Sequence, residues 1–176
     1  VGNMSAKYID QSLPKMVTAV KSILEVHKGE KGIIHASTYK IANYLNDNIG
    51  DKRLLIHTSE NRDEILEKHK RSKQPTVIIS PSMTEGIDLK DDLSRFQILV
   101  KVPFPYFGSP LVKKKASKYD WWYGYATAKT VVQSVGRSVR NDKDVAITYI
   151  MDGSWDWFYS KNERFFSEDF KQCLIK

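Results

Sequence analysis

Two arginines stand among core-type residues near the end of the chain, and their spacing is the first sign of chemistry. In "VVQSVGRSVRND", residues 131–142, Gln133, Gly136, Arg137 and Arg140 are separated by three, one and three positions. On a continuous helix these intervals place all four residues on one face. The planar fork of arginine binds two phosphate oxygens at once and keeps its charge, and the glycine beside the arginines on this face leaves room for a ligand. This face is therefore a candidate phosphate site.

The element that would carry these arginines is a long helix, expected over residues 118–139. Its apolar face, rotated from the arginine face, would pack against a sheet and consists of Ala128, Val132, Val135 and Val139. An alternative interpretation is an ordinary surface helix whose arginines pair with nearby carboxylates. Asp142 and Asp144 are close enough in sequence to serve as those partners.

The rest of the chain alternates between apolar runs and segments of helical period. Buried strands are predicted at 32–37, 53–58, 76–80, 97–102 and 145–150. Helices are predicted from Ser12 as a cap with Pro14 in the first turn, at 38–48 and at 61–72. Such alternation predicts an α/β fold with a mostly parallel sheet covered by helices on both faces. Ligands of such sheets gather at the carboxyl ends of the strands, where Ser37, Thr58 and residues 80–89 fall.

Composition narrows the class of protein. The 176 residues suffice for a single domain, taken as 1–176, and no apolar run approaches the roughly 18 residues that span a bilayer. The net charge of +7 fits a polyanion such as nucleic acid. Cys173 is the sole cysteine and the four histidines are scattered, so no metal site is expected. Because the chain begins at Val1, it is expected to be a piece of a longer protein.

One long connection mixes basic and aromatic residues. Residues 103–120, "PFPYFGSPLVKKKASKYD", are expected to form an irregular basic and aromatic loop, with Lys113, Lys114 and Lys115 at its centre. Lysines interleaved with aromatics suit single strands, through phosphate neutralisation and base stacking. Residues 153–176, which include Trp155 and Trp157, are expected to form a closing segment that packs back on the domain.

Several stretches in order resemble a known family. "GIIHASTYKIANYL" (32–45) is similar to the motif IV region of superfamily-two helicases. "SMTEGIDLKDD" (82–92), followed by "ILVKVPFP" (98–105), resembles motif V and the strand after it, and "AKTVVQSVGRSVRNDKD" (128–144) resembles motif VI. Together they resemble the second, C-terminal RecA-like motor domain of an XPD/DinG-family DNA helicase.

The resemblance implies a three-layer RecA-like (P-loop NTPase-type) domain and a division of labour. It implies that Arg140, as the arginine finger, and Arg137 act on the phosphates of ATP. It assigns Gln133, Glu85, Gly86 and Asp88 to nucleotide contacts. Nucleic acid would cross the carboxyl edge, and the residues expected to contact single-stranded DNA are Ser37, Thr38, Thr58, Thr84, Lys113, Lys114 and Lys115.

The resemblance also implies what must come from elsewhere. ATP and Mg²⁺ would be held mainly by an N-terminal RecA-like domain of the same protein, because this sequence has neither a G-x-x-x-x-G-K-[ST] loop nor an acidic box. The isolated chain is therefore expected to be inactive as an ATPase. The expected partners are that domain and single-stranded DNA, without a membrane, and the expected location is the cytoplasm or the nucleoid or nucleus.

Two other functions remain open from the sequence. The chain could be a non-catalytic nucleic-acid-binding module that keeps the helicase fold. It could also be a superfamily-two translocase outside the XPD/DinG group. The intact Gln133, Arg137 and Arg140 argue against the first, and the P-F-P stretch argues against the second.

Overall fold

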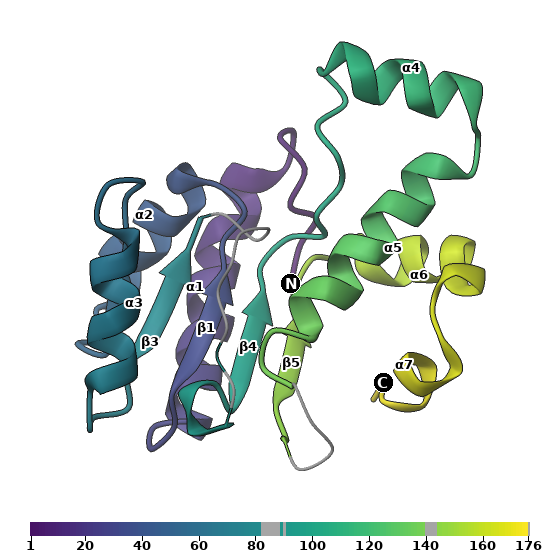
Figure 1. The fold of residues 1–176 in the computed structure, drawn as a ribbon. Coiled ribbons are helices and arrows are strands. Elements are labelled where there is room, and N and C mark those ends of the chain that lie inside the picture. Colours follow the sequence, from purple (N-terminus) through teal and green to yellow (C-terminus); the bar gives the residue numbers. More distant parts are fainter. Residues whose placement is uncertain (82–88, 90, 140–143, 176) are drawn as a thin grey trace.

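A five-stranded parallel sheet forms the centre of the computed structural model, which describes residues 1–81, 89, 91–139 and 144–175 (Figure 1). The strands are β1 (Gly32–His35), β2 (Leu54–Ile56), β3 (Val77–Ser80), β4 (Phe96–Leu99) and β5 (Ile147–Ile150). Their order is β2-β3-β1-β4-β5, and every pairing is parallel. Each strand lies within or beside one of the predicted apolar runs, so the predicted parallel sheet is confirmed.

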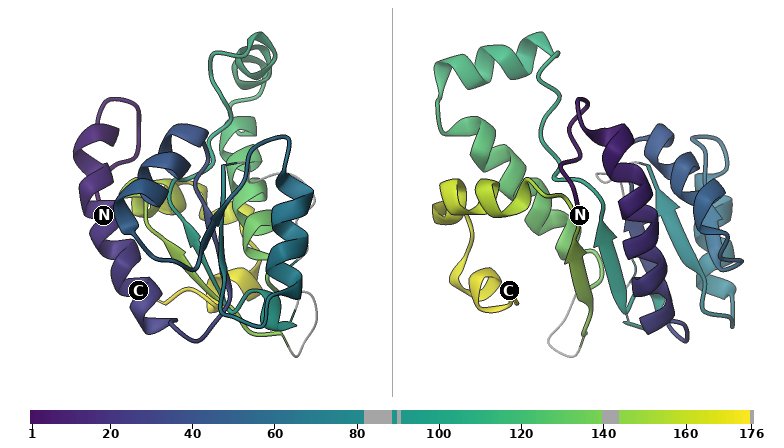
Figure 2. Two further views of the ribbon diagram at one scale, coloured as in Figure 1. Left: turned by 90° about the vertical axis from the view of Figure 1, so that its left-hand side faces the viewer. Right: turned by 180° about the vertical axis from the view of Figure 1, so that it is seen from behind.

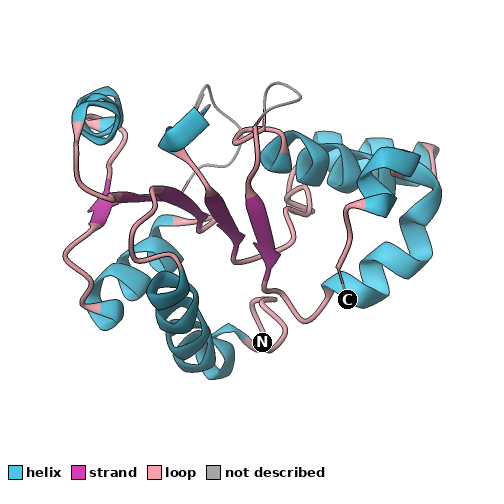
Figure 3. Cartoon of the chain, turned by 90° about the horizontal axis from the view of Figure 1, so that it is seen from below, coloured by secondary structure: helices cyan, strands magenta, loops and turns pink. Residues whose placement is uncertain are grey.

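Helices cover both faces of this sheet and give a three-layer α/β fold (Figures 2 and 3). On one face lie α1 (Ile9–Val26) and α2 (Tyr39–Ile49), packed on Ile34 and Ile98 in the largest apolar cluster. On the other lie α3 (Arg62–Arg71) and α5 (Trp122–Val135). The three central strands, β1, β3 and β4, are buried on both faces, which explains why they appear in the sequence as continuous apolar runs rather than alternating ones.

The first helix begins earlier than the sequence predicts. α1 starts at Ile9 after Tyr8, so Ser12 does not cap it and Pro14 lies inside the helix. Ser12 is buried, and its hydroxyl donates to the Asn3 carbonyl at 2.8 Å. The hydroxyl that the sequence assigned to a cap instead ties the incoming chain to the helix.

The connection at 103–120 is not irregular throughout. Residues Pro110–Lys118 form α4, which starts with proline in its first turn, a position that needs no backbone N–H donor. None of its residues is buried, and it projects beyond the carboxyl edge of the sheet (Figure 1). The predicted loop is therefore a helix that projects from the domain and is joined to it by two connecting segments, the stems, at residues 103–109 and 119–121.

The remaining elements close the domain beside β5. They are α6 (Trp155–Asn162), α7 (Glu168–Gln172) and two short 3-10 turns, η1 (Asp91–Leu93) and η2 (Glu163–Phe165). Phe158 and Phe166 are buried against Leu99 and Val131 in a second apolar cluster. Trp157, in contrast, is 62% exposed. Within the described ranges, no helix combines the length and apolar character needed to cross a lipid bilayer.

Candidate nucleotide and nucleic-acid interface

Three of the hydroxyl residues predicted to contact DNA lie at the carboxyl edge of the sheet. Ser37 and Thr38 follow β1, and Thr58 follows β2. Ser37 has φ 65°, in the left-handed region that residues other than glycine rarely adopt. Thr38 caps α2, because its hydroxyl accepts from the Ile41 backbone nitrogen at 3.3 Å. The placement matches the expectation for these residues, whereas the cap gives Thr38 a structural role as well.

Thr58 is exposed but is tied into its own loop. Its hydroxyl accepts from the backbone nitrogen of Glu60 at 3.2 Å. Both the hydroxyl and the backbone nitrogen of Thr58 donate to the Oδ1 of Asn61. The predicted residues Thr84, Glu85, Gly86, Asp88 and Arg140 lie outside the described residues.

The arginine segment does not continue the helix as predicted. α5 ends at Val135, and Gly136 is its C-cap with φ −68° and ψ 1°. Gln133 is exposed on the last turn, whereas Arg137 is half-buried in the turn that follows. The expectation that Gln133, Gly136 and Arg137 share one helical face is therefore wrong. Arg137 instead takes its position from the turn.

The buried face of α5 also differs from the predicted one. Thr127, Ala128, Val131 and Ser134 are buried, while Val132 and Val139 are exposed. Threonine and serine can face the sheet because their hydroxyls donate hydrogen bonds to backbone carbonyls of the preceding helical turn. Thr127 donates to the Tyr123 carbonyl at 2.9 Å, and Ser134 donates to the Thr130 carbonyl at 2.8 Å.

Three hydrogen bonds fasten the arginine turn, residues 135–138, to the sheet and its loops. The Gln97 side chain donates to the Val135 carbonyl at 2.7 Å. The backbone nitrogen of Leu89 donates to the Arg137 carbonyl at 3.4 Å. Ser138 donates to the hydroxyl of Ser94 at 2.7 Å, and both serines are buried. Because each anchor holds a different residue of the turn, the backbone that carries Arg137 is fixed.

A buried histidine lies beside the arginine turn. The Nε2 of His35 lies 3.2 Å from the Oε1 of Gln97. Burial lowers the pKa of His35 to about 4, the hydrogen bond with Gln97 partly opposes this, and the charge of Arg137 lowers the pKa further. His35 is thus neutral at physiological pH and adds no positive charge next to Arg137.

The alternative interpretation, a surface helix whose arginines pair with carboxylates, requires Asp142 and Asp144 as partners, and the structure describes only one of the two. Asp144 is buried, and its Oδ1 accepts from the backbone nitrogen of Asp91 at 3.2 Å, while Asp142 lies outside the described residues. In the part of the chain that the structure describes, no group of three or more His, Cys, Asp or Glu side chains is arranged to hold a metal.

The predicted lysines are all exposed on α4. The Nζ of Lys115 lies 5.3 Å from the centroid of the Trp122 ring. Near the stems of α4, a pocket of about 470 Å³ has Lys101, Tyr106, Tyr123 and Trp157 among its lining residues. Sequence reasoning missed Lys101 and Trp157 here, although the aromatic residues of 103–107 were a usable signal.

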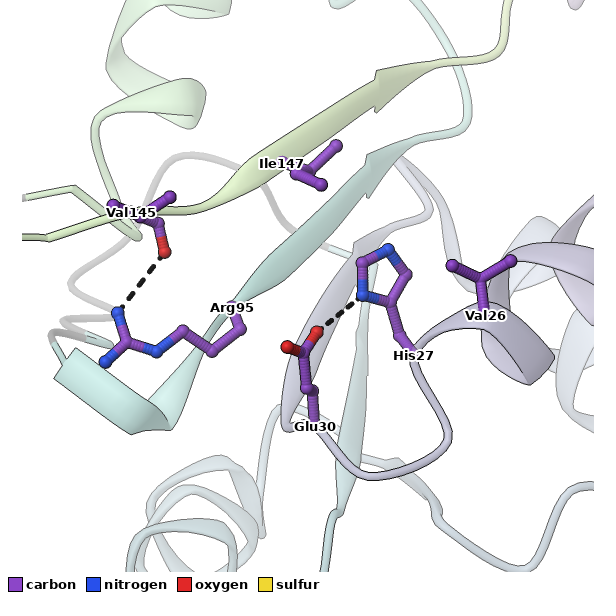
Figure 4. Close-up of a pocket in the computed structure, with 6 residues that line it drawn as sticks. All are labelled: Val26, His27, Glu30, Arg95, Val145 and Ile147. Carbon is purple, nitrogen blue, oxygen red and sulfur yellow. Dashed lines mark hydrogen bonds and ion pairs between the residues drawn. The ribbon is translucent and has the colours of Figure 1, made fainter.

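A second pocket of about 580 Å³ lies at the opposite edge of the sheet, where the strands begin (Figure 4). Arg95 and Val145 precede β4 and β5, and His27 follows α1. His27 is held by Glu30 at 2.6 Å on one ring nitrogen and by the Tyr149 hydroxyl at 2.9 Å on the other. Among the predicted site residues that the structure describes, none lines this pocket.

Comparison with known proteins agrees with the fold and the motifs. The sequence model of the "Helicase C-terminal domain" family matches residues 22–172. The chain is 31% identical to the ATP-dependent DNA helicase DinG of Photobacterium profundum over 111 residues, 56% of this chain and 16% of DinG. It is also 31% identical to the ATP-dependent DNA helicase CHL1 of Candida albicans over 171 residues, 84% of this chain and 18% of CHL1. The chain thus spans less than a fifth of these relatives.

Solved structures show the same fold. Xpd4 of S. tokodaii superposes with a TM-score of 0.67 at 17% identity, over 95% of this chain and 35% of Xpd4. The C-terminal domain of the DEAD-box protein Dbp5 gives 0.60 at 18% identity, over 86% of this chain and 78% of that domain. The chain belongs to the helicase C-terminal domain family and is a RecA-like domain of the XPD/DinG type.

Proposed function

We propose that this domain is the second motor domain of an ATP-dependent DNA helicase or translocase. In this role it supplies the arginine finger and part of the track for single-stranded DNA, while an N-terminal RecA-like domain of the same protein grips ATP. The proposal rests on the arginine turn, which is anchored through the backbone carbonyls of Val135 and Arg137 and the side chain of Ser138. Such anchoring matters because a charge stabilises a transition state only when it is held in place beforehand.

Each group has a chemical role in this proposal. Bound Mg²⁺–ATP supplies the phosphoryl group and its counter-ion. Arg137 and Arg140 would place positive charge against the phosphate oxygens, where negative charge develops during transfer. Gln133 is exposed one turn before Arg137 and can hydrogen bond to the nucleotide or to residues around it. Glu85, Gly86 and Asp88 would complete the nucleotide contacts, and Mg²⁺ would be held by the other domain.

DNA would cross the carboxyl edge of the sheet. The track proposed here joins Ser37, Thr38, Thr58 and Thr84 to the lysines of α4. Hydroxyl and ammonium groups contact phosphates without reading bases, which suits a motor that must move along any sequence. The protein would then act where the cell keeps its DNA.

The experiment is DNA-stimulated ATP hydrolysis by the full-length protein. Arg140→Ala is expected to lower kcat by about 10³-fold or more, as loss of an arginine finger does, and Arg137→Ala is expected to lower it by a smaller factor. Arg71→Ala is the matched control, because Arg71 is an exposed arginine on α3 that pairs with Glu67 at 3.6 Å. Circular dichroism would verify that each variant is folded. Near-wild-type turnover by both Arg140→Ala and Arg137→Ala would reject the proposal.

A further inference from the structure

Two polar side chains that hydrogen bond to each other are buried in the face of the sheet that α5 covers. Gln97 of β4 is 0% exposed and His35 of β1 is 2% exposed. Their neighbours on this face include Ile33, Ile78 and Leu99, all buried and apolar. An apolar residue of the same size would avoid the free-energy cost of desolvating an amide and an imidazole. The pair therefore calls for an explanation beyond packing.

The hydrogen bonds of Gln97 leave its amide only one orientation. Its Nε2 donates to the Val135 carbonyl at 2.7 Å and to the Thr148 hydroxyl at 2.9 Å. Its Oε1 must then accept, so the proton between Gln97 and His35 belongs to the Nε2 of the histidine. A reversed amide would place its oxygen against the Val135 carbonyl. The Val135 carbonyl thus fixes the orientation of the Gln97 amide, the N–H of His35 holds the oxygen end of that amide, and Gln97 holds the end of α5.

This link joins two segments of the proposed interface. Val135 is the last residue of α5, two positions before Arg137, and its carbonyl is one of those that a helix end leaves without an internal partner. His35 is the last residue of β1, two positions before Ser37 with its left-handed backbone. The Nδ1 of His35 is buried and has no hydrogen-bond partner among the described residues. A continuous chain of hydrogen bonds therefore runs from the end of β1 to the start of the arginine turn.

We propose that Gln97, held by His35, is a positioning residue that sets where Arg137 stands relative to the nucleotide. This inference rests on the proposed function, since the position of Arg137 matters for turnover only if that arginine meets the phosphates. Gln97 acts through the backbone of the arginine turn and does not touch the nucleotide. A displacement of about 1 Å in a reacting geometry can cost about 10²-fold in rate, so one buried amide is sufficient for a large effect.

The test compares Gln97→Met with Tyr149→Phe in the full-length protein. Methionine fills a similar space without a hydrogen bond, and Tyr149→Phe removes another hydrogen bond of the sheet, to His27, at the opposite edge. Gln97→Met is expected to lower kcat for DNA-stimulated ATP hydrolysis by about 10-fold or more, with the KM for ATP within about 2-fold of wild type. Tyr149→Phe is expected to lower the melting temperature while kcat stays within about 2-fold.

A double variant shows whether Gln97 acts through Arg137. In an Arg137→Ala background, Gln97→Met is expected to lower kcat by less than about 2-fold further, because the group that it positions is already gone. If the two losses multiply instead, Gln97 does not work through Arg137 and the inference is overturned. Wild-type kcat in Gln97→Met overturns it as well. If Arg137→Ala alone leaves kcat unchanged, the role of Arg137 in the proposed function fails, which is a separate outcome.

A second pair of variants decides the matter if Gln97→Met does not fold. His35→Gln keeps an N–H donor near the place of the imidazole Nε2, whereas His35→Leu removes it. We expect His35→Gln to retain most of kcat and His35→Leu to lose about 10-fold, with equal affinity for single-stranded DNA. Equal kcat in the two variants would overturn the inference.

Discussion

The carboxylate of Asp152 accepts a hydrogen bond from the backbone nitrogen of Met4 at 3.2 Å, although 148 positions separate the two residues. The same carboxylate accepts from the backbone nitrogens of Val102 and Ser154, each at 3.0 Å. Asp152 is 4% exposed, so one buried charge holds the incoming chain, the segment after β4 and the turn after β5 together. These hydrogen bonds give Asp152 a structural role.

Asp152→Asn should therefore lower the free energy of unfolding of the domain. The amide keeps one acceptor oxygen but presents an NH₂ group to a backbone N–H, so at least one charge-assisted hydrogen bond is lost. We expect a loss of about 2–3 kcal/mol in the free energy of unfolding, measured by urea denaturation. Asp156→Asn makes the same change at an exposed position of α6 and should cost less than about 0.5 kcal/mol. Equal losses in the two variants would contradict the assignment.

His35 should make stability depend on pH. Its pKa is about 4 in the folded domain and 6.5 in the unfolded chain, so only the unfolded chain takes up the proton between these values. The contribution of neutral His35 to the free energy of unfolding is therefore fully present above pH 6.5. It is lost as the pH drops towards 4, by up to about 3 kcal/mol. Asp51, whose pKa is lowered mainly by its hydrogen bond with Arg53, contributes stability that is lost at lower pH.

The measurement is the difference in unfolding free energy between wild type and His35→Gln as a function of pH. Other groups that titrate in this range, such as His69, whose pKa burial also lowers, remain in both proteins and cancel. The difference should change between pH 6.5 and 4 and be constant from pH 7 to 8. Parallel curves throughout would show that His35 does not titrate as its burial requires.

The lysines of α4 should contribute to affinity for single-stranded DNA through charge alone. Replacing Lys113, Lys114 and Lys115 by alanine should weaken binding for every sequence equally. The plot of log K against log salt should flatten by about 0.7 for each phosphate that a lysine no longer neutralises, about 2 in all. The matched control replaces Lys21, Lys28 and Lys73, three exposed lysines away from α4. An equal loss of affinity in the control would mean that net charge, and not α4, attracts DNA.

The isolated chain should not hydrolyse ATP above the background rate, with or without DNA. In the proposed function the arginines would stabilise charge on a phosphoryl group that another domain holds, and this sequence has no P-loop to hold it. A coupled-enzyme assay on the purified chain measures this directly. Turnover that persists through repeated purification and is lost in Arg137→Ala would contradict the division of labour.

The centre of the sheet could be predicted from the sequence because β1, β3 and β4 are buried on both faces. Such strands are continuous β-branched runs, and "GIIHAS", "TVIIS" and "QILVKV" needed no further information. The parallel arrangement followed from the helical segments between them. Boundaries were less accurate, as the early start of α1 at Ile9 shows.

The end of α5 could not be predicted from periodicity. The helical period places Arg137 on the helix, but α5 ends at Val135 and three tertiary hydrogen bonds stabilise the turn that follows. Valines were expected to face the sheet, yet Thr127 and Ser134 do so because their hydroxyls bond to the preceding turn. The link between His35 and Gln97 had no sequence signal, since its 62-position separation closes only in the fold.

The lack of buried residues in α4 has an evolutionary consequence. Nearly every side chain of this helix can change without creating a cavity or an unpaired polar group in the domain. Its charge and its aromatic neighbours can therefore drift between related proteins while the sheet and the arginine turn stay intact. If α4 binds DNA as proposed, selection can adjust the strength of that binding without changing the stability of the domain.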